Sequence, residues 1–224
     1  MKLYMHPVST TSRSVRLFIA ENKLPVTEQL VDISTGEHYK DEYVAINPNR
    51  MVPMLEDGDF RLTESSAILK YLATKFDKPD YPTKDLRKRA RVDEAMDWFN
   101  TQFNRDYCYG VVYPQIYSTH KRPTDEHQRG TIAWGKERTQ NWLKVLDAHW
   151  IGAKPYVTGD RITIADYFGA SLITAGDVIR TDFTEYANIE RWLATMRTLA
   201  SWNAVNEAVR GFANAVKDQR FETP

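Results

Sequence analysis

The sequence has almost no cysteine and no excess of charge of either sign. Cys108 is the only cysteine among 224 residues, which excludes an internal disulfide and fits a reducing compartment. Thirty Lys and Arg side chains balance thirty Asp and Glu side chains, which argues against a basic surface for nucleic acid. No apolar run approaches a membrane span, and the N-terminus has no signal-peptide pattern. These absences predict a cytoplasmic protein that binds neither nucleic acid nor membrane.

Repeats and low-complexity segments are also absent, and the chain divides by its periodicity into two parts. The first part, residues 1–77, alternates short apolar runs with amphipathic stretches. We expect strands at 2–5, 26–33, 52–55 and 60–62, and helices over 12–22 and from 65 onward. The turn at 57–59 predicts that the last two strands form a hairpin. The order β-α-β followed by β-β-α predicts an α/β domain.

The second part has helical periodicity throughout. Residues 78–86 contain proline and alternating charges, which indicates a linker. Beyond the linker, residues 87–224 predict an all-α domain, with helices near 86–107, 125–150, 163–179, 189–199 and 202–216. Thr163 and Asp166 have the spacing of a capping box at the start of one of these helices. We interpret that pair as structural.

Two motifs in the first part are candidates for ligand binding. A proline at the start of an interior strand lacks a donor, so Val52-Pro53 is either a cis bond that turns the backbone of Val52 outward or an ordinary trans bond. Glu64-Ser65 opens a predicted helix, whose free N–H groups can bind a carboxylate while the Glu64 carboxylate holds an ammonium. That pair of charges suits an amino acid head, although simple capping explains the motif as well.

Four hydroxyl side chains crowd the start of the first predicted helix, at residues 9–12. We expect Thr11 or Ser12 to cap the helix. Ser9 would then precede it and aim its hydroxyl at solvent or at an anionic ligand atom. A serine hydrolase is disfavoured, because no His-Asp pair is evident near Ser9 and the only nearby histidine is His6.

Several stretches taken together resemble the cytosolic glutathione transferases, in particular their theta-like, serine-dependent branch. The resemblance is dense over residues 3–98 and returns near residue 159. The stretches that carry it are GEHYKDEYVAINPNRMVPML, LTESSAILKYLATKF, DYP, KRARVDEAMDW and TGDRITIADY. It implies a thioredoxin-like N-terminal domain that holds glutathione and a helical-bundle C-terminal domain that completes the pocket for the electrophile.

The resemblance also implies roles for single residues. It implies a cis bond before Pro53, with the Val52 backbone paired to the cysteinyl part of glutathione. Glu64 and Ser65 would hold the γ-glutamyl head. The remaining glutathione contacts that it implies are His38 near the glycine carboxylate, Arg105 at the ligand site, and Arg50 in place of the lysine that many relatives carry where this chain has Met51.

Ser9 aligns with the serine that donates a hydrogen bond to the glutathione sulfur, and Thr10 is the alternative donor. The expected activity is attack of the glutathione thiolate on a small apolar electrophile, by conjugation or halide displacement. A glutathione-binding scaffold without catalysis is the alternative. Glutathione is a co-substrate, so no cofactor is expected, and the histidines lack the spacing of metal ligands. The resemblance further implies a homodimer.

The segment around Gly110 and Pro114 is rich in aromatic residues. We expect most of them to be core residues and one or two to line an apolar pocket. Cys108 is expected to be a buried, inert thiol. Because the chain ends soon after the last predicted helix, the sequence predicts a more open pocket than that of some theta enzymes.

Overall fold

The computed structural model describes every residue from 1 to 224. Its sheet contains β1 (Lys2–Met5), β2 (Thr27–Leu30), β3 (Met54–Asp57) and β4 (Phe60–Leu62) in the order β2-β1-β3-β4. β1 pairs in parallel with β2, whereas β3 is antiparallel to both β1 and β4. The four predicted strands are confirmed, although the second is shorter than expected because only residues 27–30 pair with β1. The third begins at Met54 and not at Val52.

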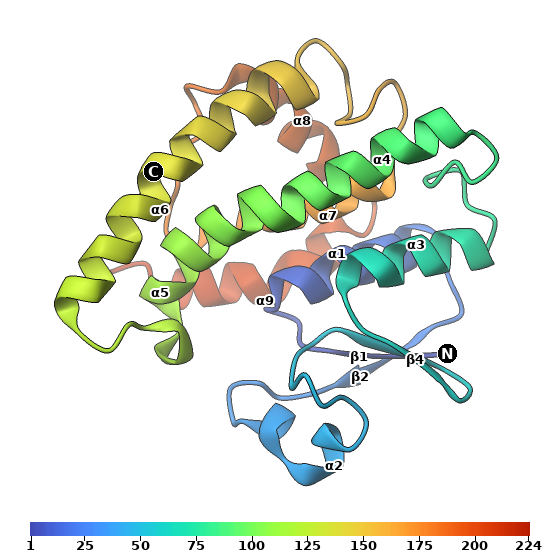
Figure 1. Cartoon of the computed structure of the whole chain (residues 1–224), viewed down its shortest axis with the longest axis horizontal. Helices are drawn as coiled ribbons and strands as arrows, with labels where there is room; N and C mark the ends of the chain where they lie inside the picture. The colour runs from blue at the N-terminus through green and yellow to red at the C-terminus, as the bar shows by residue number, and fades with distance from the viewer.

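Helices cover both faces of this sheet. α1 (Thr10–Glu21) and α3 (Ser65–Lys75) lie on one face, and the short α2 (Asp41–Val44) lies on the other (Figure 1). The alternation of side chains along β1 explains the two layers, since successive residues of a strand point to opposite faces. Leu3 and Met5 enter the main core, whereas Tyr4 packs with Val31, Tyr43 and Val52 beneath the sheet. The predicted α/β half with a thioredoxin-like arrangement is confirmed.

The chain from residue 86 onward contains no strand, only a single isolated bridge between Tyr156 and Gly159, so the predicted helical half is confirmed. Three turns of 3₁₀ helix occur in the chain, η1 (Glu37–Tyr39), η3 (Ser118–His120) and η5 (Thr174–Asp177). The other elements of the helical half are α4 (Leu86–Trp98), η2 (Phe99–Val112), α5 (Tyr113–Ile116), α6 (Asp125–Val145), η4 (Leu146–Ile151), α7 (Ile164–Ile173), α8 (Ala187–Arg197) and α9 (Trp202–Ala215).

The first of these helices is longer than the sequence predicted. It was expected to end near residue 107, but it continues through the π-helical turns of η2 into α5. Gly110 does not end it, because this glycine lies where η2 crosses α6. A Cβ atom on Gly135 of α6 would lie 2.7 Å from the carbonyl carbon of Gly110. The two glycines therefore allow the backbones of η2 and α6 to touch in mid-helix. From the sequence alone, such a glycine cannot be distinguished from one that ends a helix.

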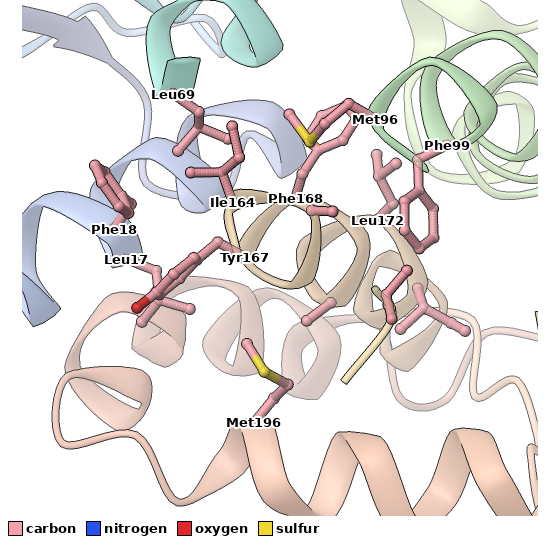
Figure 2. Close-up of a cluster of buried hydrophobic side chains, with 14 of the residues drawn as sticks. Leu17, Phe18, Leu69, Met96, Phe99, Ile164, Tyr167, Phe168, Leu172 and Met196 are labelled. Carbon is pink, nitrogen blue, oxygen red and sulfur yellow. The ribbon is translucent and has the colours of Figure 1, made fainter. Parts of the chain in front are cut away.

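α7 lies at the centre of the core, and all ten of its residues are buried. Figure 2 shows Ile164, Tyr167 and Phe168 pointing from α7 toward apolar side chains of the elements around it. These neighbours come from α1, α3, the long helix and α8; those labelled are Leu17, Phe18, Leu69, Met96, Phe99 and Met196. One continuous core therefore joins the sheet half to the helical half and fixes the position of α1 against the bundle.

The start of α7 is held by the predicted capping box, which the structure confirms. Asp166 Oδ2 accepts hydrogen bonds from the backbone N–H of Thr163 at 2.8 Å and from its hydroxyl at 3.0 Å. Oδ1 accepts from the backbone N–H of Val157 at 2.9 Å and from Trp192 Nε1 at 3.0 Å. Burial raises the pKa of Asp166 to about 6 in spite of these four donors.

α1 is tied to the bundle by a fully buried guanidinium. Arg13 Nη1 donates to Asn206 Oδ1 at 2.6 Å and to Thr174 Oγ1 at 3.2 Å, and Nη2 donates to the carbonyl oxygen of Ser171 at 2.9 Å. These bonds link α1 to α7, η5 and α9 and therefore hold the first turn of α1 in place. None of the helices is long and apolar enough to cross a lipid bilayer.

Candidate active site

A cleft of about 440 Å³ separates the sheet half from the long helix. We call its two sides the sheet-side wall and the helical wall. The sheet-side wall consists of Thr11, Asn47, Asn49, Met51, Val52, Pro53 and residues 63–65, and the helical wall consists of Asn100, Asn104, Arg105 and Tyr109. Of the predicted site residues, Val52, Pro53, Glu64, Ser65 and Arg105 line this cleft together. Residues separated by up to 53 positions in the sequence thus meet in one cavity, as the ligand-binding prediction required.

The loop before β3 forms the first part of the sheet-side wall. The Val52-Pro53 bond is cis, so this prediction is confirmed. The Met51 carbonyl oxygen accepts hydrogen bonds from the hydroxyl of Tyr43 at 2.6 Å and from Asn47 Nδ2 at 2.8 Å. Asn47 and Asn49 also line the cleft, and sequence reasoning did not single them out. The available signal for this loop is the Asn-Pro pair at 47–48, which indicates a break in regular structure.

The start of α3 forms the second part of the same wall. Glu64 precedes the helix with φ at 65° and ψ at 112°, a backbone conformation that a non-glycine residue adopts only at a cost of roughly 1–3 kcal/mol. Its side chain makes no capping bond, so its carboxylate is free at the cleft. Ser65, the first helical residue, is 6% exposed. The free N–H groups at the start of α3 can bind a carboxylate, and the Glu64 carboxylate can bind an ammonium. Together they suit a ligand end that carries both charges.

The hydroxyl cluster at the start of α1 differs from the prediction. Ser9 itself is the N-cap, and its Oγ accepts from the backbone N–H of Ser12 at 3.3 Å. The expectation that Thr11 or Ser12 caps this helix was wrong, because the helix begins at Thr10, two residues earlier than expected. The Ser12 hydroxyl is buried and has no hydrogen-bond partner. A capping hydroxyl accepts with its oxygen, so the cap itself does not use the proton of Ser9.

The two threonines after Ser9 point in different directions. Thr11 lines the cleft, and its Oγ1 lies 3.4 Å from Ser9 Oγ and donates to the Val52 carbonyl oxygen at 3.2 Å. Thr10 is buried beside Tyr113 of α5. Burial raises the pKa of Tyr113 well above its ordinary value, and a hydrogen bond with Thr10 opposes that rise. Ser9 and Thr10 are not lining residues of the cleft, and Thr11 is the hydroxyl that sequence reasoning missed there.

The helical wall consists of Asn100, Asn104, Arg105 and Tyr109, all on η2. Arg105 is held in a fixed orientation by its neighbour Asp106, to which Nε donates at 2.7 Å and Nη2 at 2.9 Å. Burial favours the neutral form of Asp106, but hydrogen bonds from Arg105 and Trp142 outweigh it and hold the pKa below its ordinary value. Asp106 therefore stays ionised and keeps two of the three Arg105 nitrogens occupied.

Two predicted contact residues lie outside the lining of the cleft. His38 is in η1, and its Nδ1 is buried without a hydrogen-bond partner. Burial lowers the pKa of His38. Arg50 is exposed with φ at 55°, while its neighbours Asn49 and Met51 reach the cleft. Arg50 therefore flanks the part of the cleft that the loop before β3 forms.

Comparison with known proteins shows the family to which this chain belongs. Residues 1–74 match the model of the glutathione S-transferase N-terminal domain. The chain is 34% identical to human glutathione S-transferase theta-1 over 171 residues, which cover 74% of this chain and 69% of the relative. It is 36% identical to the bovine theta-1 protein over 172 residues, with the same coverage. The chain belongs to the glutathione S-transferase family.

Solved structures of this family agree with the fold over the whole transferase chain. The structure of human glutathione transferase theta-2, a complex with glutathione and an unknown ligand, superposes with a TM-score of 0.82 at 27% identity. The match covers all of this chain and 93% of the theta-2 chain. A delta-class transferase of Nilaparvata lugens gives the same score and identity, covering 96% of this chain and 98% of that one. The predicted likeness to theta-class transferases is confirmed.

The only cysteine of this transferase, Cys108, lies in the core. Cys108 is fully buried, and its Sγ lies 3.7 Å from the Leu172 carbonyl oxygen. Burial raises the pKa of Cys108 to about 12. The prediction that Cys108 is buried is confirmed, and a thiol in that environment is expected to stay protonated at neutral pH.

Proposed function

We propose that the protein is a glutathione transferase that binds glutathione along the sheet-side wall and attacks an electrophile from its sulfur. The observation that carries the proposal is the meeting of Val52, Glu64 and Ser65 in one cleft beside the start of α1. Glu64 would pair with the ammonium of the γ-glutamyl head, and the N–H groups at Ser65 with its carboxylate. The Val52 backbone would pair with the cysteinyl part. Arg50 would receive the glycine end, because its neighbours Asn49 and Met51 line the cleft, and His38 would join it as the family resemblance implies.

Ser9 would activate the thiol. A cysteine-like thiol has a pKa of about 8.5, so only about 3% is thiolate at neutral pH. A fall of about two units requires roughly 2.7 kcal/mol of differential stabilisation. A hydrogen bond to a charged acceptor contributes about 1.5–3 kcal/mol, and a helix N-terminus adds about 0.3–1 kcal/mol. Ser9 would combine both contributions, since it caps α1 and the cap does not use its proton.

The test is the ultraviolet absorbance of the thiolate in the enzyme–glutathione complex, titrated against pH. Ser9→Ala should raise the pKa of the bound thiol by about one unit or more, and turnover near neutral pH should fall about tenfold, with partial recovery at high pH. Thr11→Val is the matched comparison for the rival hydroxyl. Superimposable titrations of wild type and Ser9→Ala would contradict the assignment of Ser9, and a shift in Thr11→Val alone would move the role to Thr11.

The same titration separates a transferase from a scaffold that has kept the fold without catalysis. A scaffold would bind glutathione in calorimetry with the thiol pKa near its free value and would turn over no electrophile. An enzyme lowers that pKa and conjugates aryl or alkyl halides. The cytoplasmic location remains a prediction, which fractionation of the source cells would test.

We also propose that the transferase is a homodimer in which the sheet half of one subunit contacts the helical half of the other. The support is the exposure of large apolar side chains on both halves. Phe60 on β4 is 46% exposed, and Trp134 on α6 is 62% exposed. Closed two-fold dimers are the commonest oligomers and would cover such side chains. Light scattering at micromolar concentration should give twice the chain mass, and Phe60→Glu should shift the mass toward the monomer.

A further inference from the structure

The loop between β1 and α1, residues 6–9, is a single tight turn. The backbone N–H of Ser9 donates to the His6 carbonyl oxygen at 3.0 Å. Pro7 occupies the second position of this turn, where its restricted φ angle is favourable. Ser9 is therefore held on the β1 side by the bond to His6 and on the α1 side by its capping bond to Ser12.

The His6 side chain closes the same turn a second time. Its Nδ1 accepts a hydrogen bond from the backbone N–H of Val8 at 3.4 Å, and the side chain is 12% exposed. Asp and Asn side chains at the first position of a turn commonly accept from the N–H two residues on, and here an imidazole takes that place. Because Nδ1 is the acceptor, the neutral ring carries its proton on Nε2.

The groups that face His6 favour this neutral form. Nε2 lies 3.9 Å from Asp32 Oδ1, in the loop after β2. Hydrogen bonds from Ser34 hold the pKa of Asp32 below its ordinary value, so an ionised carboxylate faces the Nε2 proton. Burial lowers the pKa of His6, Asp32 opposes that fall, and Arg16 of α1 and His38 of η1 add to it. The ring is therefore neutral at neutral pH, and its Nδ1 can accept.

The His6–Asp32 pair does not make Ser9 the nucleophile of a hydrolase. In a catalytic triad the histidine accepts the proton of the serine hydroxyl directly. Here the Ser9 hydroxyl contacts residues 11–12 of α1 and neither ring nitrogen of His6. The nitrogen that could accept the proton binds the backbone N–H of Val8 instead. His6 therefore acts on the shape of the loop and not on the hydroxyl itself.

From this geometry we infer that His6 is a positioning residue of the transferase, whose Nδ1 fixes the turn that holds the Ser9 hydroxyl at the glutathione sulfur. The inference rests on the proposed role of Ser9 and goes beyond it, since His6 is not among the residues that line the cleft. Protonation of the ring would place a proton on Nδ1, facing the Val8 N–H. That hydrogen bond would be lost, and Ser9 would lose its fixed position. Acid would thus reduce turnover twice, by protonating the thiolate and by releasing Ser9.

Two substitutions separate the acceptor from the titratable ring. His6→Asn keeps an acceptor at the first position of the turn but cannot be protonated, whereas His6→Phe keeps a flat ring without an acceptor. With the full-length enzyme, glutathione and benzyl chloride near neutral pH, His6→Asn should keep kcat within about threefold of wild type. His6→Phe should lower kcat about tenfold and raise the pKa of the bound thiol by about one unit. His127→Phe, on the exposed face of α6, should change neither property.

The pH profile tests the titration of the ring and does not depend on the folding of His6→Phe. At saturating glutathione, log kcat of wild type should fall with a slope of about one as the thiol protonates. The slope should approach about two at lower pH, where His6 protonates as well. His6→Asn should keep a slope of about one throughout, because only the thiol then titrates. Identical profiles for wild type and His6→Asn would contradict the inference.

A double variant shows whether His6 acts through Ser9. In Ser9→Ala, adding His6→Phe should raise the thiol pKa no further, because the hydroxyl that His6 positions is already absent. A further rise in the double variant would overturn the inference. An unchanged thiol pKa in His6→Phe beside a raised one in Ser9→Ala would also overturn it and leave the proposed role of Ser9 standing. Unchanged values in both single variants would overturn both proposals.

Discussion

Helices α1 and α7 both begin at a hydroxyl residue, Ser9 in one and Thr163 in the other. At α7 the cap is closed on itself, because Asp166 returns the hydrogen bond and also takes one from Trp192 Nε1. At α1 the first helical turn contains no acidic residue, and the Ser9 hydroxyl accepts from the backbone N–H of Ser12 and lies 3.4 Å from Thr11 Oγ1. The hydrogen-bonding groups of the reciprocated cap of α7 bond to each other, whereas the one-sided cap of α1 does not use the hydroxyl proton, which could be donated to a ligand. The difference lies in the partners and not in the capping residue.

The largest expected effect comes from opening the closed cap. Asp166→Ala would leave the backbone N–H of Val157, that of Thr163 and Trp192 Nε1 buried without an acceptor. Each such group costs about 1–3 kcal/mol, so we expect the free energy of unfolding to fall by roughly 3 kcal/mol or more. Denaturant unfolding measures the change. Asp160→Ala, an exposed carboxylate in the same loop, is the control and should stay within about 0.5 kcal/mol of wild type. Equal losses in the two variants would refute a special role for the closed cap.

The start of α3 lies between these two extremes, because Glu64 precedes the helix and caps nothing. Glu64→Ala should weaken glutathione binding by about 1–3 kcal/mol, since an ammonium would lose its charged partner. It should change the free energy of unfolding very little, because the carboxylate makes no bond within the protein. Titration calorimetry measures the affinity, and Glu56→Ala, on the neighbouring strand and outside the lining of the cleft, is the matched control. An unchanged affinity in folded Glu64→Ala would remove Glu64 from the site.

The open cap at Ser9 predicts two separable effects. Because Ser9 caps α1, Ser9→Ala should cost about 0.5–2 kcal/mol of stability, whereas Ser9→Gly should cost only a few tenths. Both variants lack the hydroxyl, so both should raise the pKa of the bound thiol equally. Thermal unfolding and the thiolate titration measure the two properties on the same samples. A thiol pKa that follows stability across the two variants would show that Ser9 acts through the helix and not on the sulfur.

The two motifs of the sheet-side wall could be predicted from the sequence, whereas of the helical wall only Arg105 was expected, from the family resemblance. Val52-Pro53 and Glu64-Ser65 are local motifs, in which the residue that binds is also the residue that shapes the backbone. On η2 the residues that face the cleft depend on the phase of a long helix that passes through π-helical turns. A period of 3.6 residues does not give that phase, so Asn100 and Asn104 went unnoticed. The end of this helix was missed for a related reason, since Gly110 serves a contact with Gly135 that lies 25 residues away.

The smallest effect on the thiol should come from Thr10, the hydroxyl next to Ser9 in the sequence. Thr10 is 5% exposed and its hydroxyl interacts with the phenol of the buried Tyr113, so it belongs to the contact between α1 and α5. Thr10→Val keeps the volume and removes the hydroxyl. We expect no measurable shift in the thiol pKa, but a loss of stability of about 1 kcal/mol, because the Tyr113 phenol loses its partner. A double-mutant cycle with Tyr113→Phe should recover most of that loss as coupling energy. A thiol pKa that rises in Thr10→Val while Ser9→Ala leaves it unchanged would place the donor one residue along and make α1, like α7, a helix whose cap serves only the fold.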